Sequence, residues 1–178
     1  RKKHSGKQTT SSPADGYTFL VSDGSLVSSN PALFKQLAYA PKDMVPVALL
    51  GQTPLFLAAH PDFPASTLRE FVDYVKARPG EINYGSSGVG SVFHMMGELF
   101  NQTAGVRIKH VPYRGVAPAM QDVISGHIPM VFISVSNAIP AMQTGRVKIL
   151  AVLEPTRYAG LPQVRSMSEI VPAFQKPS

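Results

Sequence analysis

The segment at residues 85–91, with the sequence GSSGVGS, is the part of the chain whose residue types and spacing best suit the binding of an anion. It lies between a short β-type run and a helical pattern, and ligands of α/β sheets usually bind where a strand ends. The helix that follows would present unpaired backbone N–H groups and a partial positive charge. The glycines would let a ligand approach the backbone, and the serines would add hydroxyl donors. The candidate ligand-binding residues here are Ser86, Ser87, Gly88, Gly90 and Ser91.

Catalytic loops of known types do not fit this segment. A phosphate-binding P-loop needs Lys directly after Gly90, where Ser91 stands. A dinucleotide fingerprint that begins at Gly88 needs glycine where Phe93 stands, and a nucleophile elbow at the first serine needs glycine in place of Tyr84. We therefore predict no catalytic residue and no enzymatic activity. Whether the segment binds an anion or is an ordinary glycine-rich turn with its last serine as helix cap stays open.

Three other groups near this segment could take part in chemistry. His94 and Glu98 stand four residues apart in a helical pattern, but no third ligand follows at a metal-binding spacing, so we predict no metal site. A His–Glu pair, or a histidine that reaches back to the glycine-rich loop, is the favoured interpretation. His110 lies on a predicted strand and is expected to be a hydrogen-bonded core histidine. The loop within residues 110–119 either supplies more backbone donors beside the first loop or is a rigid turn.

The composition excludes several classes of protein. With 44% hydrophobic and 16% charged residues the chain is too apolar for disorder, and no apolar stretch approaches the ~18 residues of a membrane-spanning helix. The absence of cysteine excludes disulfides and thiolate metal sites, and no cofactor is predicted. Of the net charge of +6, the first seven residues supply four. A nucleic-acid partner is therefore not predicted.

The elements that must position these residues follow from hydrophobic periodicity and turn signals. The clearest helix spans residues 67–77, where Thr67 and Glu70 have the spacing of a capping box. From residue 66 onward helices and strands alternate with short connections, which predicts a parallel sheet with helices on both faces. The other expected helices span 91–103, 117–124 and 137–144, and the strands 82–84, 106–111, 130–133 and 147–153. Upstream, a strand is expected at 17–21, a short helix at 31–37, and one or two buried strands within 45–59.

An ordered series of short motifs carries a resemblance to a known family. Besides residues 84–91, the series comprises His94, 97–100 (GELF), 110–115 (HVPYRG), 117–119 (APA), 15–18 (DGYT), 30–31, 76–80 (KARPG), 145–152, Arg157, 161–162 and Glu169. Over about residues 14–174 the chain resembles the Bug-type receptors of tripartite tricarboxylate transporters. The resemblance implies a type II periplasmic-binding-protein fold with two lobes. It also implies a periplasmic receptor that captures a small organic carboxylate and delivers it to a membrane permease.

The resemblance also suggests how the chain is divided and where the ligand binds. Residues 1–14 are expected to be disordered or atypical, 15–59 to be part of a first lobe and its crossing, 60–150 to be the second lobe, and 151–178 to be the return crossing and a further part of the first lobe. Site residues of the first-lobe loop would be Ser22, Asp23, Gly24 and Ser25. Ser134 is a further candidate, in a strand-end loop where family members commonly have an aspartate.

Two other classes of function remain as alternatives. A ligand-sensing regulatory domain shares the two-lobed architecture, but it would need an attached DNA-binding helix-turn-helix. A small-molecule enzyme would need a strongly perturbed titratable group in the cleft, and His94 is the nearest candidate.

Overall fold

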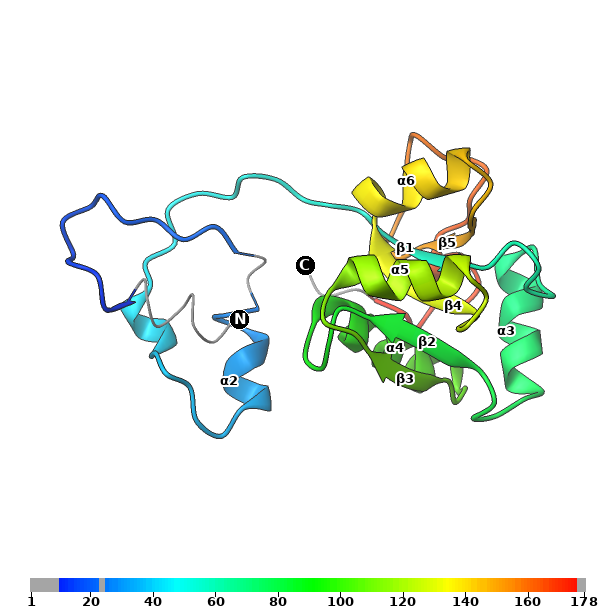
Figure 1. Cartoon of the computed structure of the whole chain (residues 1–178), viewed down its shortest axis with the longest axis horizontal. Helices are drawn as coiled ribbons and strands as arrows, with labels where there is room; N and C mark the ends of the chain where they lie inside the picture. The colour runs from blue at the N-terminus through cyan, green and yellow to red at the C-terminus, as the bar shows by residue number, and fades with distance from the viewer. Residues whose placement is uncertain (1–9, 23–24, 176–178) are drawn as a thin grey trace. The chain divides into compact units, whose positions relative to one another are not determined.

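The computed structural model describes residues 10–22 and 25–175, which form two units, residues 1–51 and 52–178. Each unit is described by itself. The predictions for residues 1–9, Asp23 and Gly24 lie outside the described residues. The predicted division into lobes and crossings stays a prediction. Figure 1 shows the course of the chain.

The described part of the first unit contains helix α2 (Ser29–Leu33) and a 3₁₀ helix, η1 (Pro41–Asp43), but no strand. The strand predicted at residues 17–21 is therefore wrong. Tyr17, Phe19 and Val21 are all more than half exposed. Because a strand is stable only when a neighbour pairs with its backbone, apolar alternation alone does not produce one here. The helix predicted at 31–37 is shorter and begins two residues earlier.

The second unit is built on one five-stranded sheet (Figure 1). In the order of the sheet its strands are β3 (Lys109–Pro112), β2 (Asn83–Ser86), β4 (Met130–Ser134), β1 (Leu55–Ala59) and β5 (Lys148–Val152). β2 pairs in parallel with β3 and with β4, as predicted.

The four strands after residue 66 share one direction, as predicted, but the sheet contains one further strand that is antiparallel. β1 is antiparallel to both of its neighbours, β4 and β5, so the sheet is mixed. β1 lies between β4 and β5, which come much later in the chain, so the local alternation of elements does not set its direction. Of the apolar stretch at 45–59 only Leu55–Ala59 forms a strand, while Val45, Val47, Leu49 and Leu50 are exposed.

Helices cover both faces of the sheet, as the alternation predicted. Helices α3 (Leu68–Lys76) and α4 (Val92–Ala104) pack on one face, together with the C-terminal segment that contains the 3₁₀ helix η2 (Met167–Glu169). Helices α5 (Val116–Ile124) and α6 (Val135–Gln143) pack on the other. All five residues of β1 are buried, as expected for a strand covered on both sides.

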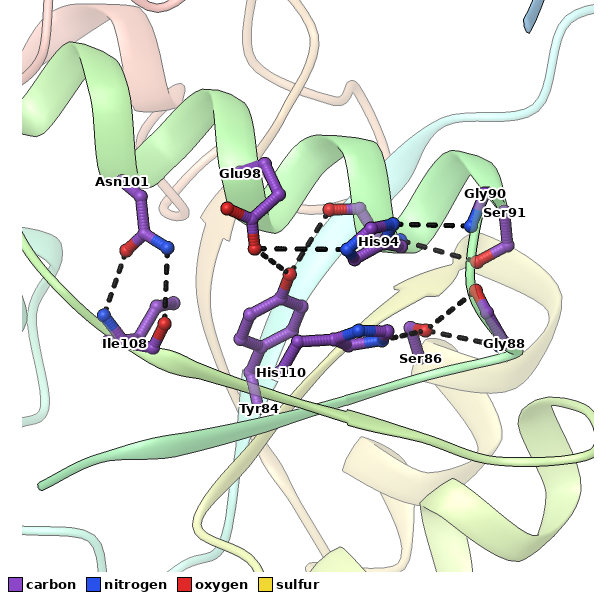
Figure 2. Close-up of polar contacts among 10 residues, drawn as sticks. All are labelled: Tyr84, Ser86, Gly88, Gly90, Ser91, His94, Glu98, Asn101, Ile108 and His110. Carbon is purple, nitrogen blue, oxygen red and sulfur yellow. Dashed lines mark hydrogen bonds and ion pairs between the residues drawn. The ribbon is translucent and has the colours of Figure 1, made fainter. Parts of the chain in front are cut away.

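The helix that carries the glycine-rich loop has well-defined ends. At its start the Oγ of Ser91 accepts a hydrogen bond from the backbone N–H of His94, at 3.3 Å. It ends at Gly105, whose φ of 63° suits glycine. Asn101 ties the helix to β3, because its side-chain amide donates to the carbonyl of Ile108 and accepts from the N–H of the same residue (Figure 2). The loop is thus held between a packed helix and the sheet.

In the part of the chain that the structure describes, none of the helices has the length and hydrophobicity needed to cross a bilayer.

Candidate ligand-binding site

The structure brings the predicted loops of the second unit to one edge of the sheet. β2, β3 and β4 run in the same direction, so the loops after their last residues begin at the same edge. The N–H of Tyr113, in the second loop, donates to the carbonyl of Ser86 at 3.0 Å and so joins the first two loops. Ser134 is the last residue of β4 and the N-cap of α6. Its hydroxyl lies 3.0 Å from the hydroxyl of Ser136, and it accepts a hydrogen bond of 3.0 Å from the side-chain amide of Asn137.

Two glycines set the shape of the first loop. Gly88 has a φ of 124° and Gly90 a φ of 76°, values that residues other than glycine rarely adopt. A Cβ at Gly88 would also lie 3.3 Å from the backbone oxygen of Tyr113. The close approach of the two loops therefore depends on glycine at this position.

The side chain of Ser86 makes hydrogen bonds inside the unit and is not an exposed donor. Its side chain is fully buried. The hydroxyl accepts from the N–H of Gly88 at 3.1 Å, lies 3.1 Å from the carbonyl of the same residue, and lies 2.6 Å from Nε2 of His110 (Figure 2). Direct contact between Ser86 and a ligand stays a prediction, but these bonds already hold the loop in its shape.

His94 reaches back to the loop, which is one of the two interpretations that the sequence favoured. Its Nδ1 accepts a hydrogen bond from the N–H of Gly90 at 3.2 Å. Its Nε2 lies 3.9 Å from Oε1 of Glu98, which is an ion pair only when His94 is protonated, so the second interpretation, a His–Glu surface pair, stays a prediction. Among the described residues no group of three His, Cys, Asp or Glu side chains is arranged to hold a metal ion.

The backbone donors of the loop therefore fall into two sets. The N–H groups of Gly88, Gly90 and Ser91 are used within the loop. Within the described chain, four further N–H groups have no hydrogen-bond partner, and they belong to Ser87, Val89, Val92 and Phe93. The side chain of Ser87 is half-buried and makes no hydrogen bond in that same part of the chain. A carboxylate would find its donors in this second set, at the start of α4.

The electrostatics beneath the loop favour neutral side chains. Burial, and then the positive charge that His94 can carry, lower the pKa of His110 to about 4, while Glu98 acts in the opposite direction. Burial is the main cause of the raised pKa of Tyr84, and its hydroxyl donates to Glu98 at 2.8 Å, which raises it further. The Tyr84 ring packs so closely on α4 that a Cβ at Gly97 would lie 2.2 Å from it. Only glycine fits there.

The second loop adds a cation that sequence reasoning did not single out. Arg114 follows β3 at the same edge, is exposed, and has no ion pair or hydrogen bond with the residues that the structure describes. Its position in a loop directly after a strand was a signal that could have marked it. Its neighbour Tyr113 donates to Asp122 at 2.5 Å, and burial followed by this bond raises the pKa of Tyr113 to about 12.

The candidate residues of the first unit are described by themselves. Ser22 is exposed, and Ser25 is buried with its carbonyl bonded to the N–H of Asn30 at 2.9 Å. A site shared between the two units stays a prediction. A separate groove of about 380 Å³ lies between α5 and α6, where Met120, Ile124 and Arg146 are among the lining residues. None of the predicted site residues lines it.

Comparison with known proteins shows the family of this chain. The sequence model of the tripartite tricarboxylate transporter family receptor matches residues 5–178. The chain belongs to this receptor family. It is 32% identical over 156 residues to a UPF0065 protein of Bordetella pertussis, covering 88% of this chain and 48% of that protein. It is also 32% identical over 164 residues to BugT of the same species, covering 91% and 50%. The chain thus spans about half the length of the curated relatives it matches.

Solved structures show the same fold. An R. palustris protein with adipate superposes with a TM-score of 0.91 and 28% identity, covering 97% of this chain and 58% of that one. MatC from Rhodopseudomonas palustris, with bound malate, gives a TM-score of 0.84 and 32% identity, covering 97% and 60%. The periplasmic binding protein BugD gives a TM-score of 0.84 and 28% identity, covering 94% of this chain and 56% of that one. The periplasmic-binding-protein fold predicted from the sequence is confirmed, and the family and fold are those of solute-binding receptors rather than enzymes.

Proposed function

We propose that the full-length protein is a periplasmic receptor that captures a small organic carboxylate for a tripartite tricarboxylate-type transporter. Membership of the receptor family is the observation that carries this proposal. Two solved relatives with adipate and malate add the class of ligand, since both are dicarboxylates. A membrane permease would be the partner that receives the acid, and export would place the receptor on the same side of the membrane as its solute.

The chemistry at the sheet edge suits such a ligand. A carboxylate accepts hydrogen bonds from backbone N–H groups at a helix start, where the helix dipole also favours negative charge. The unpaired N–H groups of Val92 and Phe93 and the hydroxyl of Ser87 meet this requirement. Arg114 supplies a positive charge at the same edge, which would attract an acid before it binds. The predicted ligand residues Ser86, Gly88, Gly90, Ser91 and Ser134 would then shape or border this set.

A thermal-shift titration of the full-length protein tests the class of ligand. Adipate, malate and a tricarboxylate are compared with adipamide, which has the length of adipate but no charge. A carboxylate present at about a hundred times its Kd should stabilise the protein by about 2.7 kcal/mol, and adipamide should not. A shift with a sugar or a metal cation, and with none of the acids, would reject the proposal.

Ser87→Ala tests the site itself. Loss of a hydrogen bond to a charged group should weaken binding roughly tenfold or more, as measured by calorimetry, without changing the unfolding temperature of the free protein. Ser125→Ala is the matched control, because Ser125 is an exposed serine at the opposite end of α5. Equal affinities of the two variants would show that residues 85–91 form only a turn.

A further inference from the structure

Two stacked imidazoles lie directly beneath the glycine-rich loop. The rings of His94 on α4 and His110 on β3 have centroids 4.0 Å apart, with planes inclined at 28° (Figure 2). His110 also stacks on Tyr84, at 5.1 Å. Each imidazole holds one point of the loop: His94 holds the N–H of Gly90, and His110 holds the hydroxyl of Ser86.

The hydrogen bonds of the pair specify where the protons are. Nδ1 of His94 accepts from the N–H of Gly90, so it carries no proton. The Ser86 hydroxyl has one hydrogen and two lone pairs, and it meets the N–H and the carbonyl of Gly88 as well as Nε2 of His110. All three contacts are satisfied together when Nε2 of His110 donates to the oxygen. The loop shape in the structure therefore requires that Nδ1 of His94 carries no proton and that Nε2 of His110 carries one.

A proton added to Nδ1 of His94 must break its bond to the N–H of Gly90. The titratable groups packed against the imidazoles are Tyr84 from β2 and Glu98 from α4. With its pKa lowered to about 4, His110 stays neutral in mildly acidic solution. A protonated His94 would have Glu98 beside its Nε2 to balance its charge. Its Nδ1, however, would become a donor that faces the N–H donor of Gly90.

We propose that His94 and His110 are positioning residues for the ligand loop, and that protonation of His94 releases Gly90 and weakens carboxylate binding. This inference rests on the proposed function. The added charge is balanced by Glu98, so the loss of the Gly90 bond outweighs any attraction between His94 and the ligand. Acidification therefore changes the shape of the loop more than it changes the electrostatic potential around the loop. His94 acts through the loop and does not touch the ligand.

Two variants of His94 separate the acceptor from the ring. In His94→Asn the amide oxygen takes the place of Nδ1 but does not titrate. In His94→Phe the ring remains and the acceptor is lost. The backbone amide resonance of Gly90 is followed by NMR in this chain without ligand, from about pH 8 to about pH 5.5, the range in which histidines usually titrate. It should shift together with the His94 ring in the wild type and stay constant in His94→Asn, with Gly105 as internal reference.

Carboxylate affinity of the full-length protein is then measured over the same range. Because the acid itself titrates, the affinity of the wild type is divided by the affinity of His94→Asn at each pH. This ratio should fall roughly threefold to tenfold on acidification, the effect of losing about one hydrogen bond. At the upper end of the range, His94→Phe should bind weakly, and His94→Asn should recover part of that loss.

The outcomes distinguish this inference from the proposed function. A Gly90 resonance that ignores pH, a ratio that stays constant, or a wild type that binds more tightly in acid would overturn the role of His94. If carboxylic acids bind to the wild type and to His94→Asn with the same pH profile, the proposed receptor function is supported and the proposed role of His94 is wrong. If Gly90 titrates with His94 but no acid binds, the proposed function fails, and with it the link between this bond and binding.

Discussion

Ser86 and Ser87 are neighbours with the same side chain, yet the fold gives them different tasks. The side chain of Ser86 points into the unit, where its hydroxyl is hydrogen-bonded to Gly88 and His110. Ser87 is half-buried and keeps its hydroxyl available. Because successive residues near the end of a strand alternate in direction, only one of the two can hold the loop from inside. Substitutions at these positions should therefore act differently, on loop shape at Ser86 and on ligand affinity at Ser87.

His110 should make the stability of the chain depend on pH. Its pKa falls from 6.5 to about 4 on folding because the ring is partly buried and faces His94, so the unfolded chain binds the extra proton more readily. Its contribution is fully present above pH 6.5 and is lost as the pH falls toward 4. For a partly exposed ring we expect a loss on the order of 1–2 kcal/mol. Urea unfolding of wild type and His110→Gln at several pH values measures it.

The glutamine is the matched variant here because its amide nitrogen can still donate to Ser86 but does not titrate in this range. The stability of His110→Gln should be flatter between pH 6.5 and 4 than that of the wild type. Identical slopes would show that His110 does not take part in the acid response.

At the scale of elements, α3 shows how local sequence sets a boundary. The hydroxyl of Thr67 accepts from the N–H of Glu70 at 3.2 Å, and the Glu70 carboxylate accepts from the N–H groups of Ser66 and Thr67. These bonds lower the pKa of Glu70. On the inner side of the helix, Phe71 and Val75 are fully buried.

Thr67→Ala should destabilise the second unit by about 1 kcal/mol, because the backbone N–H of Glu70 loses the hydroxyl that accepts its hydrogen bond. Thermal unfolding followed by circular dichroism measures the change. Thr53→Ala is the control, since Thr53 is exposed and lies outside any helix or strand. An equal effect of the two substitutions would mean that the capping box does not stabilise α3.

Capping and periodicity are local properties, and this is why most of the second unit could be predicted from sequence. The capping box at Thr67, Ser91 as N-cap and Gly105 as terminator are all found in the structure. The direction of β1 could not be predicted, because it depends on strands more than 70 residues away in the sequence. The strand expected at 17–21 failed for the same reason, since a local pattern does not say whether a pairing partner is present.

The loop at the strand end could be predicted from the sequence, but its internal hydrogen bonds could not, and ligand binding there stays a prediction. Glycines and serines before a helix marked a loop at a strand end, although Gly85 and Ser86 are the last residues of β2 and the loop itself spans residues 87–91. The sequence could not show that His110, 24 residues away, would bond to Ser86. It also could not show which N–H groups the loop would use for itself, because this depends on side-chain orientations in the folded unit.

At the scale of the whole molecule, the segment before β1 should be where proteases act first. Leu49 and Leu50 are 79% and 78% exposed, and the second unit begins at residue 52. Brief digestion with chymotrypsin should therefore cut near these leucines and leave a resistant fragment that contains β1 to η2. Mass spectrometry of the products identifies the cut. Leu55 and Leu57, which are buried, serve as internal controls. Early cuts at these two residues would contradict the division into units.

The link between Asn101 and Ile108 has a consequence for how copies of this protein meet one another. β3 is a border strand of the sheet, and the N–H of Lys109 points inward, to the carbonyl of Ile82. The backbone groups of Ile108 therefore face outward, where a strand of another molecule could otherwise dock. The amide of Asn101 makes the same two bonds that such a strand would make. A single side chain thus occupies the backbone groups of Ile108 that such a strand would need, while it holds α4 beneath the glycine-rich loop.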